Sequence, residues 1–306
     1  MSRPLKVGVQ LPEVERVVRW PEQLEMARRI EELGYDAIWV GDHLLYRWPD
    51  AAQARGPWEC WTMLAAIAAS TSRVALGPLV ASTSFHAPAM LAKQAATIDE
   101  ISGGRLILGL GAGWNQTEYE AFGFPFDHRI GRFEEAFTII RTLLREGSID
   151  FQGTYYQVRD CELLPRPARP GGPPLLLGSS GQRMLRIAAP HIDVWNAWYN
   201  ATGNRPAGVA PLRAQVDAAA LAAGREPAEI ERTVAVLVRL AGGTGRLMGN
   251  ESMGGIPALT GSAEALAEEL RAYARAGIGA VQVVLDPITL GSIEAFGSVL
   301  EVLDRN

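Results

Sequence analysis

The chain has 306 residues, of which 48% are hydrophobic and 21% are charged, and its mean hydropathy is +0.03. This ordinary globular composition excludes a disordered, collagen-like or coiled-coil chain. The 29 basic and 34 acidic residues give a formal net charge of −5, which does not favour nucleic acid or an anionic lipid surface as a partner. The length allows either two domains or one α/β barrel of more than about 250 residues.

No targeting or membrane-spanning segment is recognisable in the sequence. The first apolar segment is only about six residues long, which is too short for the hydrophobic region of a signal peptide. No apolar run approaches the ~20 residues that a membrane helix needs. Cys60 and Cys161 lie far apart, and no further thiol or histidine pair has ligand spacing, so neither a disulfide framework nor a metal site is expected. We therefore expect a cytoplasmic protein.

From the N-terminus onward, short apolar runs alternate with segments of helical periodicity. Residues 6–11 are Val-rich and end before Pro12, which predicts a strand, and residues 21–33 have helical spacing and stop at Gly34, which predicts a helix. Further strands are predicted at residues 37–40, 74–81 and 106–110, with helices near 58–70, near 88–101 and within 130–145. In the second half, strands are predicted at residues 174–177, 194–198, 233–241 and 281–285, with helices at 182–189, 206–223, 262–276 and 293–303.

Eight strand–helix pairs predict an α/β fold, a (β/α)₈ TIM barrel. The strands are nearly continuous apolar runs, as in a parallel sheet covered by helices. A doubly wound sheet stays open as an alternative, because strand order cannot be read from one sequence. Residues 149–173 interrupt the pattern between the fourth helix and the fifth strand and predict two short β segments followed by Pro-rich irregular chain. Residues 242–257 are Gly-rich and predict a mobile loop after the seventh strand, so one domain over residues 1–306 accounts for the length.

Candidate site residues follow the carboxyl ends of the predicted strands, where barrels of this kind place their sites. The second strand runs into Gly41-Asp42-His43, which suits acid–base chemistry or polarisation of a cofactor, although a solvated loop pair or a capping aspartate is the alternative. The third strand contains Gly77-Pro78, which predicts either a bulge for a flat ligand or a local irregularity.

The fourth and fifth strands both end in glycine. Residues 109–114 resemble a dinucleotide-binding fingerprint but have Trp114 in place of its third glycine, which leaves a Gly-rich loop that a ligand can approach closely. Gly178-Ser179-Ser180-Gly181 directly precede a predicted helix and form either an anion seat or a simple capping turn. Ser180 lacks the following glycine of a nucleophile elbow, so a hydrolase is not indicated.

In this order the segments resemble the luciferase-like (bacterial luciferase-type) flavin and deazaflavin oxidoreductases. The resemblance is strongest at residues 91–105, 108–114 and 118–123, and it extends to residues 41–43, 174–181 and 193–196. It therefore covers most of the chain. Each short segment is unspecific, but their combination is specific.

The resemblance implies a TIM-type barrel with a flavin-type ring held over the strand ends. Asp42 and His43 would then be catalytic and lie near the reactive centre of the ring, with His43 donating a proton or polarising an oxygen or carbonyl. The implied cofactor-binding residues are Leu79, Val80 and Ala81, with a cis peptide between Leu79 and Val80; Gly111, Ala112, Gly113 and Trp114 along the ring or tail; and Gly178, Ser179, Ser180 and Gly181 at the phosphate.

The implied function is hydride transfer to a small organic substrate, or its monooxygenation, with reduced coenzyme F420 or FMN. The motif set favours coenzyme F420, and a separate reductase and a homodimer are implied as partners. Trp114 stands where deazaflavin-dependent sugar dehydrogenases of this superfamily have an acidic residue, so sugar dehydrogenation is not expected. His86 stands where members of the family often have arginine. The alternative is a non-catalytic barrel that binds or carries flavin.

Overall fold

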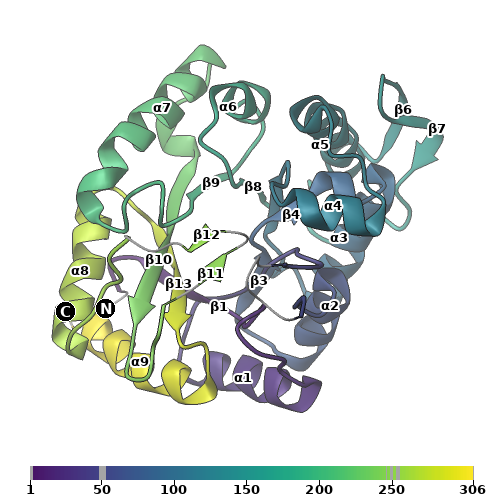
Figure 1. The fold of residues 1–306 in the computed structure, drawn as a ribbon. Helices are drawn as coiled ribbons and strands as arrows, with labels where there is room; N and C mark the ends of the chain where they lie inside the picture. Colours follow the sequence, from purple (N-terminus) through teal and green to yellow (C-terminus); the bar gives the residue numbers. More distant parts are fainter. Residues whose placement is uncertain (1–2, 48–52, 246, 249–250, 253–255, 306) are drawn as a thin grey trace.

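The computed structural model describes residues 3–47, 53–245, 247–248, 251–252 and 256–305. A parallel sheet of nine strands forms the centre of the molecule, and helices surround it (Figure 1). The strand order is β3-β2-β1-β13-β10-β9-β8-β5-β4. Strand β1 (Lys6–Gln10) pairs with both β2 (Ala37–Val40) and β13 (Ala280–Asp286). The first and last sheet strands in chain order, β1 and β13, are therefore neighbours in the sheet. This order is that of a barrel and excludes the doubly wound sheet.

The elements follow the predicted alternation. The remaining strands of the sheet are β3 (Ala75–Pro78), β4 (Ala81–Ser82), β5 (Leu108–Gly111), β8 (Leu175–Leu177), β9 (Val194–Ala197) and β10 (Glu231–Arg239). The α-helices are α1 (Trp20–Glu32), α2 (Cys60–Ser70), α3 (Pro88–Ser102), α4 (Gln116–Phe122), α5 (Arg129–Arg145), α6 (Gln182–Ala188), α7 (Val209–Ala222), α8 (Ala263–Arg275) and α9 (Leu290–Asp304). The 3₁₀ turns are η1 (Thr83–Phe85), η2 (Pro206–Gly208) and η3 (Pro227–Glu229). The predicted (β/α)₈ barrel is confirmed.

The third barrel strand is split, where a single strand over residues 74–81 was predicted. Strand β3 pairs with β2, whereas β4 pairs with β5, and the Leu79–Val80 peptide between the two pieces is cis. A parallel bridge between Leu76 and Leu106 closes the barrel on this side. A Cβ on Gly77 would lie 2.1 Å from the Ile107 carbonyl oxygen, so glycine is needed where the neighbouring chain crosses.

The core has two parts, because strand residues alternate between the helices and the barrel interior. Outward side chains such as Val7 and Val9 pack against the helices, and Met26 and Ile30 are among the buried residues that α1 contributes to this outer layer. Inside the barrel, Trp39 and Leu176 belong to a smaller apolar cluster. This layered packing fixes the strand ends on which the site is built.

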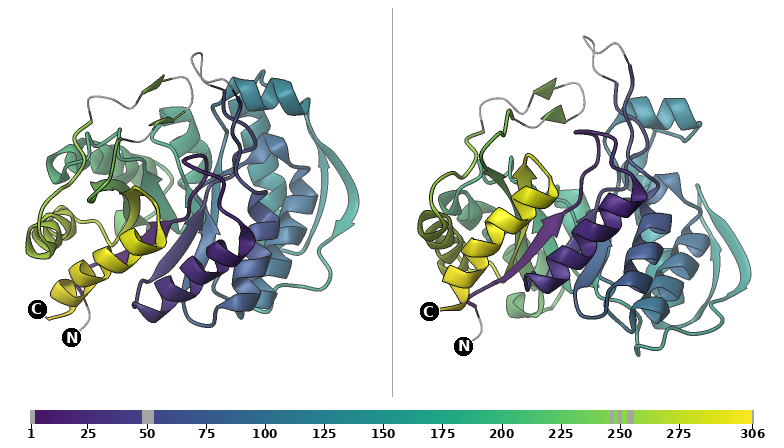
Figure 2. Two further views of the ribbon diagram at one scale, coloured as in Figure 1. Left: turned by 60° about the horizontal axis from the view of Figure 1, so that its bottom comes forward. Right: turned by 90° about the horizontal axis from the view of Figure 1, so that it is seen from below.

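Two hairpins lie outside the barrel. Strands β6 (Ser148–Gln152) and β7 (Gln157–Glu162) pair antiparallel beside α5, at the right of Figure 1. Strands β11 (Leu247–Met248) and β12 (Glu251–Ser252) pair in the Gly-rich stretch after β10 (Figure 2). That stretch was predicted to be a mobile loop over residues 242–257, and part of it (246, 249–250 and 253–255) lies outside the described residues.

Helix α4 was not predicted, since seven residues give too little periodicity to recognise. Near the two ends of the described chain, Arg3 donates to Asp304 at 2.8 Å, and helices α1 and α9 lie side by side (Figure 2). No helix in the described ranges has both the length and the apolar character needed to cross a bilayer. The single domain over residues 1–306 stays a prediction.

Candidate active site

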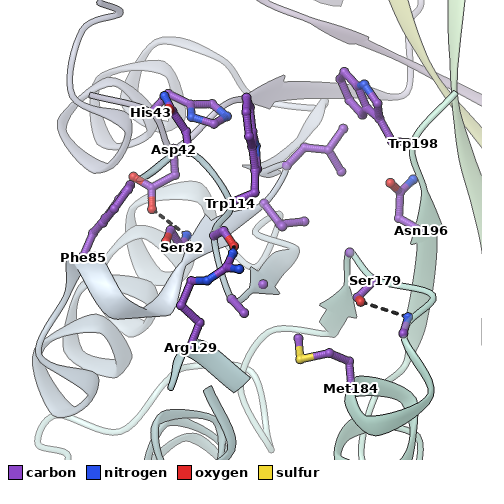
Figure 3. A pocket seen from close by; sticks show the side chains of 18 of the residues that line it. Asp42, His43, Ser82, Phe85, Trp114, Arg129, Ser179, Met184, Asn196 and Trp198 are labelled. Carbon is purple, nitrogen blue, oxygen red and sulfur yellow. Dashed lines mark hydrogen bonds between the residues drawn. The ribbon is translucent and has the colours of Figure 1, made fainter. Parts of the chain in front are cut away.

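A cavity of about 880 Å³ lies at the carboxyl ends of the barrel strands (Figure 3). Its volume is within the range of small-molecule sites, roughly 300–1,000 Å³. The predicted residues at 42–43, 79–80, 111–114 and 178–181 all line it. Ala81 does not: it is fully buried in β4, where it pairs with Leu110 behind the cavity wall. The structure therefore brings together residues from four separate strand ends.

His43 is held by Glu118, a residue that the sequence analysis did not assign to the site. His43 Nδ1 lies 2.7 Å from Glu118 Oε1, and the carboxylate is buried, with 1% of its side chain exposed. The backbone N–H groups of Leu44 and Leu45 donate to the other carboxylate oxygen at 2.5 and 3.1 Å. Helix α4 thus fixes both the imidazole ring and the loop after β2, and His43 itself lines the cavity.

The surroundings of His43 favour its protonated form. Burial alone lowers the pKa of the imidazole, but the hydrogen bond and charge of Glu118, with the charges of Glu13 and Asp42, outweigh burial and raise the pKa above its usual value. His43 therefore stays protonated to a higher pH than a free imidazole does. This is the state that donates a proton.

Asp42 makes a separate couple and does not hold His43. Its carboxylate accepts a hydrogen bond from Ser82 N at 2.9 Å and lies 2.8 Å from His86 Nε2. Asp42 was predicted to act with His43 as a titratable pair. In the structure Asp42 lines the cavity, and its carboxylate contacts the backbone of Ser82 and the ring of His86; its catalytic role stays a prediction.

Glu13 is a further carboxylate that the sequence analysis missed. It follows β1, is 5% exposed, lines the cavity and forms a hydrogen bond with the Gln10 amide. A Cβ on Gly41 would lie 1.8 Å from Glu13 Oε1, so Gly41 makes room for this carboxylate. The available sequence signal for this contact was Gly41, because a glycine at a strand end suggests a close neighbour. That neighbour, Glu13, lies 28 positions earlier in the chain, so no local pattern identifies it.

The glycines at the ends of β5 and β8 make room for Val80. A Cβ on Gly111 would lie 2.7 Å from Val80 Cγ2, and one on Gly178 would lie 2.8 Å from either methyl group of Val80. Gly113 has φ +70°, and its Cβ would meet Tyr119 Oη at 2.0 Å. The sequence analysis explained Gly111 and Gly113 by close approach of a ligand and placed Gly178 in an anion seat or a capping turn. The structure gives another reason, which is the packing of the cavity wall itself.

Arg129 adds a positive charge to the cavity lining. Arg129, at the start of α5, is half-buried, donates to the Gly113 carbonyl oxygen at 2.6 Å and lies 4.2 Å from the centre of the Phe126 ring. Among the described residues, no carboxylate forms an ion pair with it. Residues 178–181 also line the cavity, and Gly181 N donates to Ser179 Oγ at 3.2 Å. The cavity lining therefore contains both carboxylates and a guanidinium.

Two tryptophans line the cavity (Figure 3). Trp114 is 48% exposed, and its ring lies edge-on to His43 with the centroids 5.7 Å apart. Trp198 follows β9 and faces the same space. Trp114 and Trp198 therefore belong to the pocket, whereas Trp39 and Trp195 are buried.

The chain matches the luciferase-like monooxygenase family model over residues 6–243, and it belongs to that family. It is 35% identical over 173 residues to the pyrimidine monooxygenase RutA of Cronobacter sakazakii, covering 55% of this chain and 50% of the relative. It is 34% identical over 170 residues to an F420-dependent glucose-6-phosphate dehydrogenase of Amycolatopsis mediterranei, covering 54% and 49%. The matches thus span about half the length of these curated relatives.

Solved structures share the fold over nearly the whole chain. An F420-dependent secondary alcohol dehydrogenase, in complex with an F420–acetone adduct, superposes with a TM-score of 0.81 at 19% identity, covering 98% of this chain and 99% of that one. A riboflavin lyase with modified FMN and riboflavin gives a TM-score of 0.82 at 16% identity, covering 98% and 91%. At these identities the similarity establishes the barrel fold alone.

Proposed function

We propose that this protein is an oxidoreductase that uses a reduced flavin-type cofactor, coenzyme F420 or FMN, to reduce or monooxygenate a small organic substrate. The observation that carries the proposal is the His43–Glu118 couple at the wall of a cavity that Arg129 also lines. Family membership supports it, as do relatives named for a monooxygenase and for an F420-dependent dehydrogenase.

The residues at the site fit such a cofactor. Leu79 and Val80 present an apolar wall for one face of a flat ring, and residues 111–114 would flank it. Arg129 and the backbone amides of residues 178–181 would hold the phosphate, because a half-buried cation with no carboxylate partner among the described residues favours an anion. Ala81 supports the wall from behind.

When bound, the cofactor supplies the hydride, or in the case of reduced FMN also the activation of oxygen. The chain's own residues hold the proton and position the substrate. His43 holds a proton at Nε2 for the oxygen or carbonyl of the substrate, and Glu118 orients the imidazole and keeps it charged. The tryptophan walls exclude water and position the substrate beside His43.

Titration of the purified protein with FMN and with coenzyme F420 tests the proposal. Trp114 and Trp198 line the cavity, so binding of either cofactor should quench the intrinsic tryptophan fluorescence in a saturable way. Coenzyme F420 is expected to bind more tightly. If neither cofactor quenches the fluorescence, the proposed function is wrong; binding with no turnover of any reducible substrate would instead favour the carrier barrel. The separate reductase, the homodimer and the cytoplasmic location stay predictions.

A further inference from the structure

A separate cavity of about 310 Å³ lies at the amino ends of the barrel strands, opposite the active-site cavity. We call it the basal cavity. Its lining includes the first residues of six strands: Lys6, Ala37, Ala75, Val194, Glu231 and Ala280. The volume is at the lower end of the range for small-molecule sites, roughly 300–1,000 Å³. The basal cavity is therefore large enough for a compact ligand.

Small residues keep the basal cavity open. Ala37, Ala75 and Ala280 stand at three of the strand starts, and Gly8 follows two positions into β1. A Cβ on Gly8 would lie 2.5 Å from Trp39 Nε1, so this glycine makes room for the indole ring. The interior of a (β/α)₈ barrel is ordinarily filled by layers of bulky branched side chains. The lowest layer of this barrel is therefore only partly filled by the chain itself.

Two buried hydrogen-bond donors line the basal cavity and have no partner among the described residues. They are the indole nitrogen of Trp39, which is 3% exposed, and the amide nitrogen of Gln282, which is 1% exposed. Neither residue lines the active-site cavity, and neither nitrogen is fully enclosed by protein atoms. The open space beside both donors is therefore the basal cavity. Buried donors of native proteins normally have a partner, so these two favour an acceptor in that space.

The neighbours of Gln282 fix the orientation of its amide. The Thr233 hydroxyl donates to the Trp195 carbonyl oxygen at 3.0 Å, so it accepts the hydrogen bond from Asn196 Nδ2 at 2.9 Å. The same Nδ2 also donates to Gln282 Oε1 at 2.6 Å. The acceptor atom of Gln282 is thus already bonded, and the nitrogen without a partner is a donor.

The outer part of the basal cavity has an excess of positive charge. Lys6 and Glu231 form an ion pair at 3.2 Å, and Asp36 pairs with Arg3 at 3.1 Å. Arg73 is exposed, lines the cavity and donates to two backbone carbonyl oxygens. No carboxylate pairs with Arg73 among the described residues, so its guanidinium favours an anionic group at this place.

We propose that the basal cavity binds a small carboxylic acid whose compact apolar body carries a carbonyl oxygen at the end away from the carboxylate. The carbonyl oxygen accepts hydrogen bonds from Gln282 Nε2 and Trp39 Nε1. Leu176 and Val194 contact the apolar body, and the carboxylate meets Arg73. A neutral acceptor suits the inner end, because burying a charge beside neutral groups costs far more. This site is separate from the active site and does not rest on the proposed function.

Three para-substituted benzene probes test the assignment on the whole protein without cofactor. The first, para-acetylbenzoate, carries both groups; para-isopropylbenzoate lacks the carbonyl, and para-(hydroxymethyl)acetophenone lacks the carboxylate. Isothermal titration calorimetry measures the dissociation constants. We expect para-acetylbenzoate to bind about fivefold or more tightly than para-isopropylbenzoate, because two hydrogen bonds are lost, and roughly three- to tenfold more tightly than the neutral probe.

Filling the basal cavity locates the bound probe. Ala280→Leu places a larger side chain in the cavity and should abolish binding of para-acetylbenzoate. Ala218→Leu is the matched control, because Ala218 is exposed on α7 and lines neither cavity, and it should leave binding unchanged. Thermal unfolding verifies that both variants are folded. Binding that survives in folded Ala280→Leu would overturn the site.

A second variant tests the carboxylate without changing the barrel interior. Arg73→Gln should weaken para-acetylbenzoate roughly three- to tenfold and change the affinity of para-(hydroxymethyl)acetophenone by less than about twofold. Arg28→Gln, on the exposed face of α1 and outside both cavities, should alter neither affinity. No saturable binding of para-acetylbenzoate to the wild type would overturn the proposal, as would equal affinity for para-acetylbenzoate and para-isopropylbenzoate. Neither result would bear on the proposed function, since no cofactor is present.

Discussion

The two histidine–carboxylate couples of the site have nearly the same geometry and different positions. His43 and Glu118 lie 2.7 Å apart, and His86 and Asp42 lie 2.8 Å apart; in each couple the histidine side chain is 15% exposed and the acid 1%. Yet His43 lines the cavity, whereas His86 lies outside its lining and packs edge-on against Trp61. The geometry of the couple therefore does not distinguish the two histidines. Access to the cavity does, and on that ground we propose His43 as the proton donor.

Replacing the histidine of each couple gives the largest contrast. His43→Ala should lower turnover by about 100-fold or more, the range of lost general acid catalysis, and change cofactor affinity less than about threefold. Steady-state kinetics and fluorescence titration measure the two effects. His86→Ala is the matched control and should leave turnover within about tenfold of wild type. Equal losses in both variants would remove the distinction between the couples.

Glu118→Gln should act through the pKa of His43. Glu118 raises that pKa, so its charge keeps the imidazole protonated as the pH rises, and the variant should lose activity on the alkaline side first. We expect the alkaline limb of the kcat/KM profile to move to lower pH, with a loss of about tenfold at pH 8 and a smaller one at pH 6. An unmoved alkaline limb would contradict the role assigned to Glu118.

The raised pKa of His43 also makes the contribution of the His43–Glu118 couple to protein stability depend on pH. Its contribution to the free energy of unfolding is fully present below the unfolded-state pKa of histidine and is lost as the pH rises through the folded-state pKa of His43. Denaturant unfolding between pH 5 and pH 9 should show this fall in the wild type. The fall should be reduced in Glu118→Gln.

His86→Ala should affect stability more than chemistry. The buried carboxylate of Asp42 loses one of its two hydrogen-bond partners, which should lower the free energy of unfolding by about 1–3 kcal/mol. Denaturant unfolding measures this change. His86→Asn, which keeps a donor group, should recover part of the stability, and full stability of His86→Ala would show that the couple does not fix the wall.

Glu13→Gln should give the smallest effect. Glu13 raises the pKa of His43 by its charge alone and less than Glu118 does, so the alkaline limb should move in the same direction by a smaller amount. Turnover at pH 8 should fall by about twofold. If the alkaline limb moved further in Glu13→Gln than in Glu118→Gln, Glu13 and not Glu118 would be the main cause of the raised pKa of His43.

Local patterns predicted most of the fold and half of the site. Apolar runs such as residues 37–40 and helical spacing such as residues 88–101 gave eight strand–helix pairs, because each pattern reflects one segment and its buried face. Asp42 and His43 were found because the carboxyl ends of barrel strands converge. Their partners His86 and Glu118 were not assigned to the site, because nothing local in the sequence relates residues 44 or 75 positions apart.

The sequence by itself determined the eight strand–helix pairs and the residues that follow each strand, because period, burial and turn residues act over short distances. The tertiary structure alone decided the strand order that makes the sheet a barrel, that Glu118 holds His43, that Asp42 holds His86, and that Gly111 and Gly178 make room for Val80. It also placed Arg129 and Arg183 in the lining of one cavity. The physical reason is that hydrogen bonds, close packing and charge act between neighbours in space, and these neighbours come from different strand–helix units.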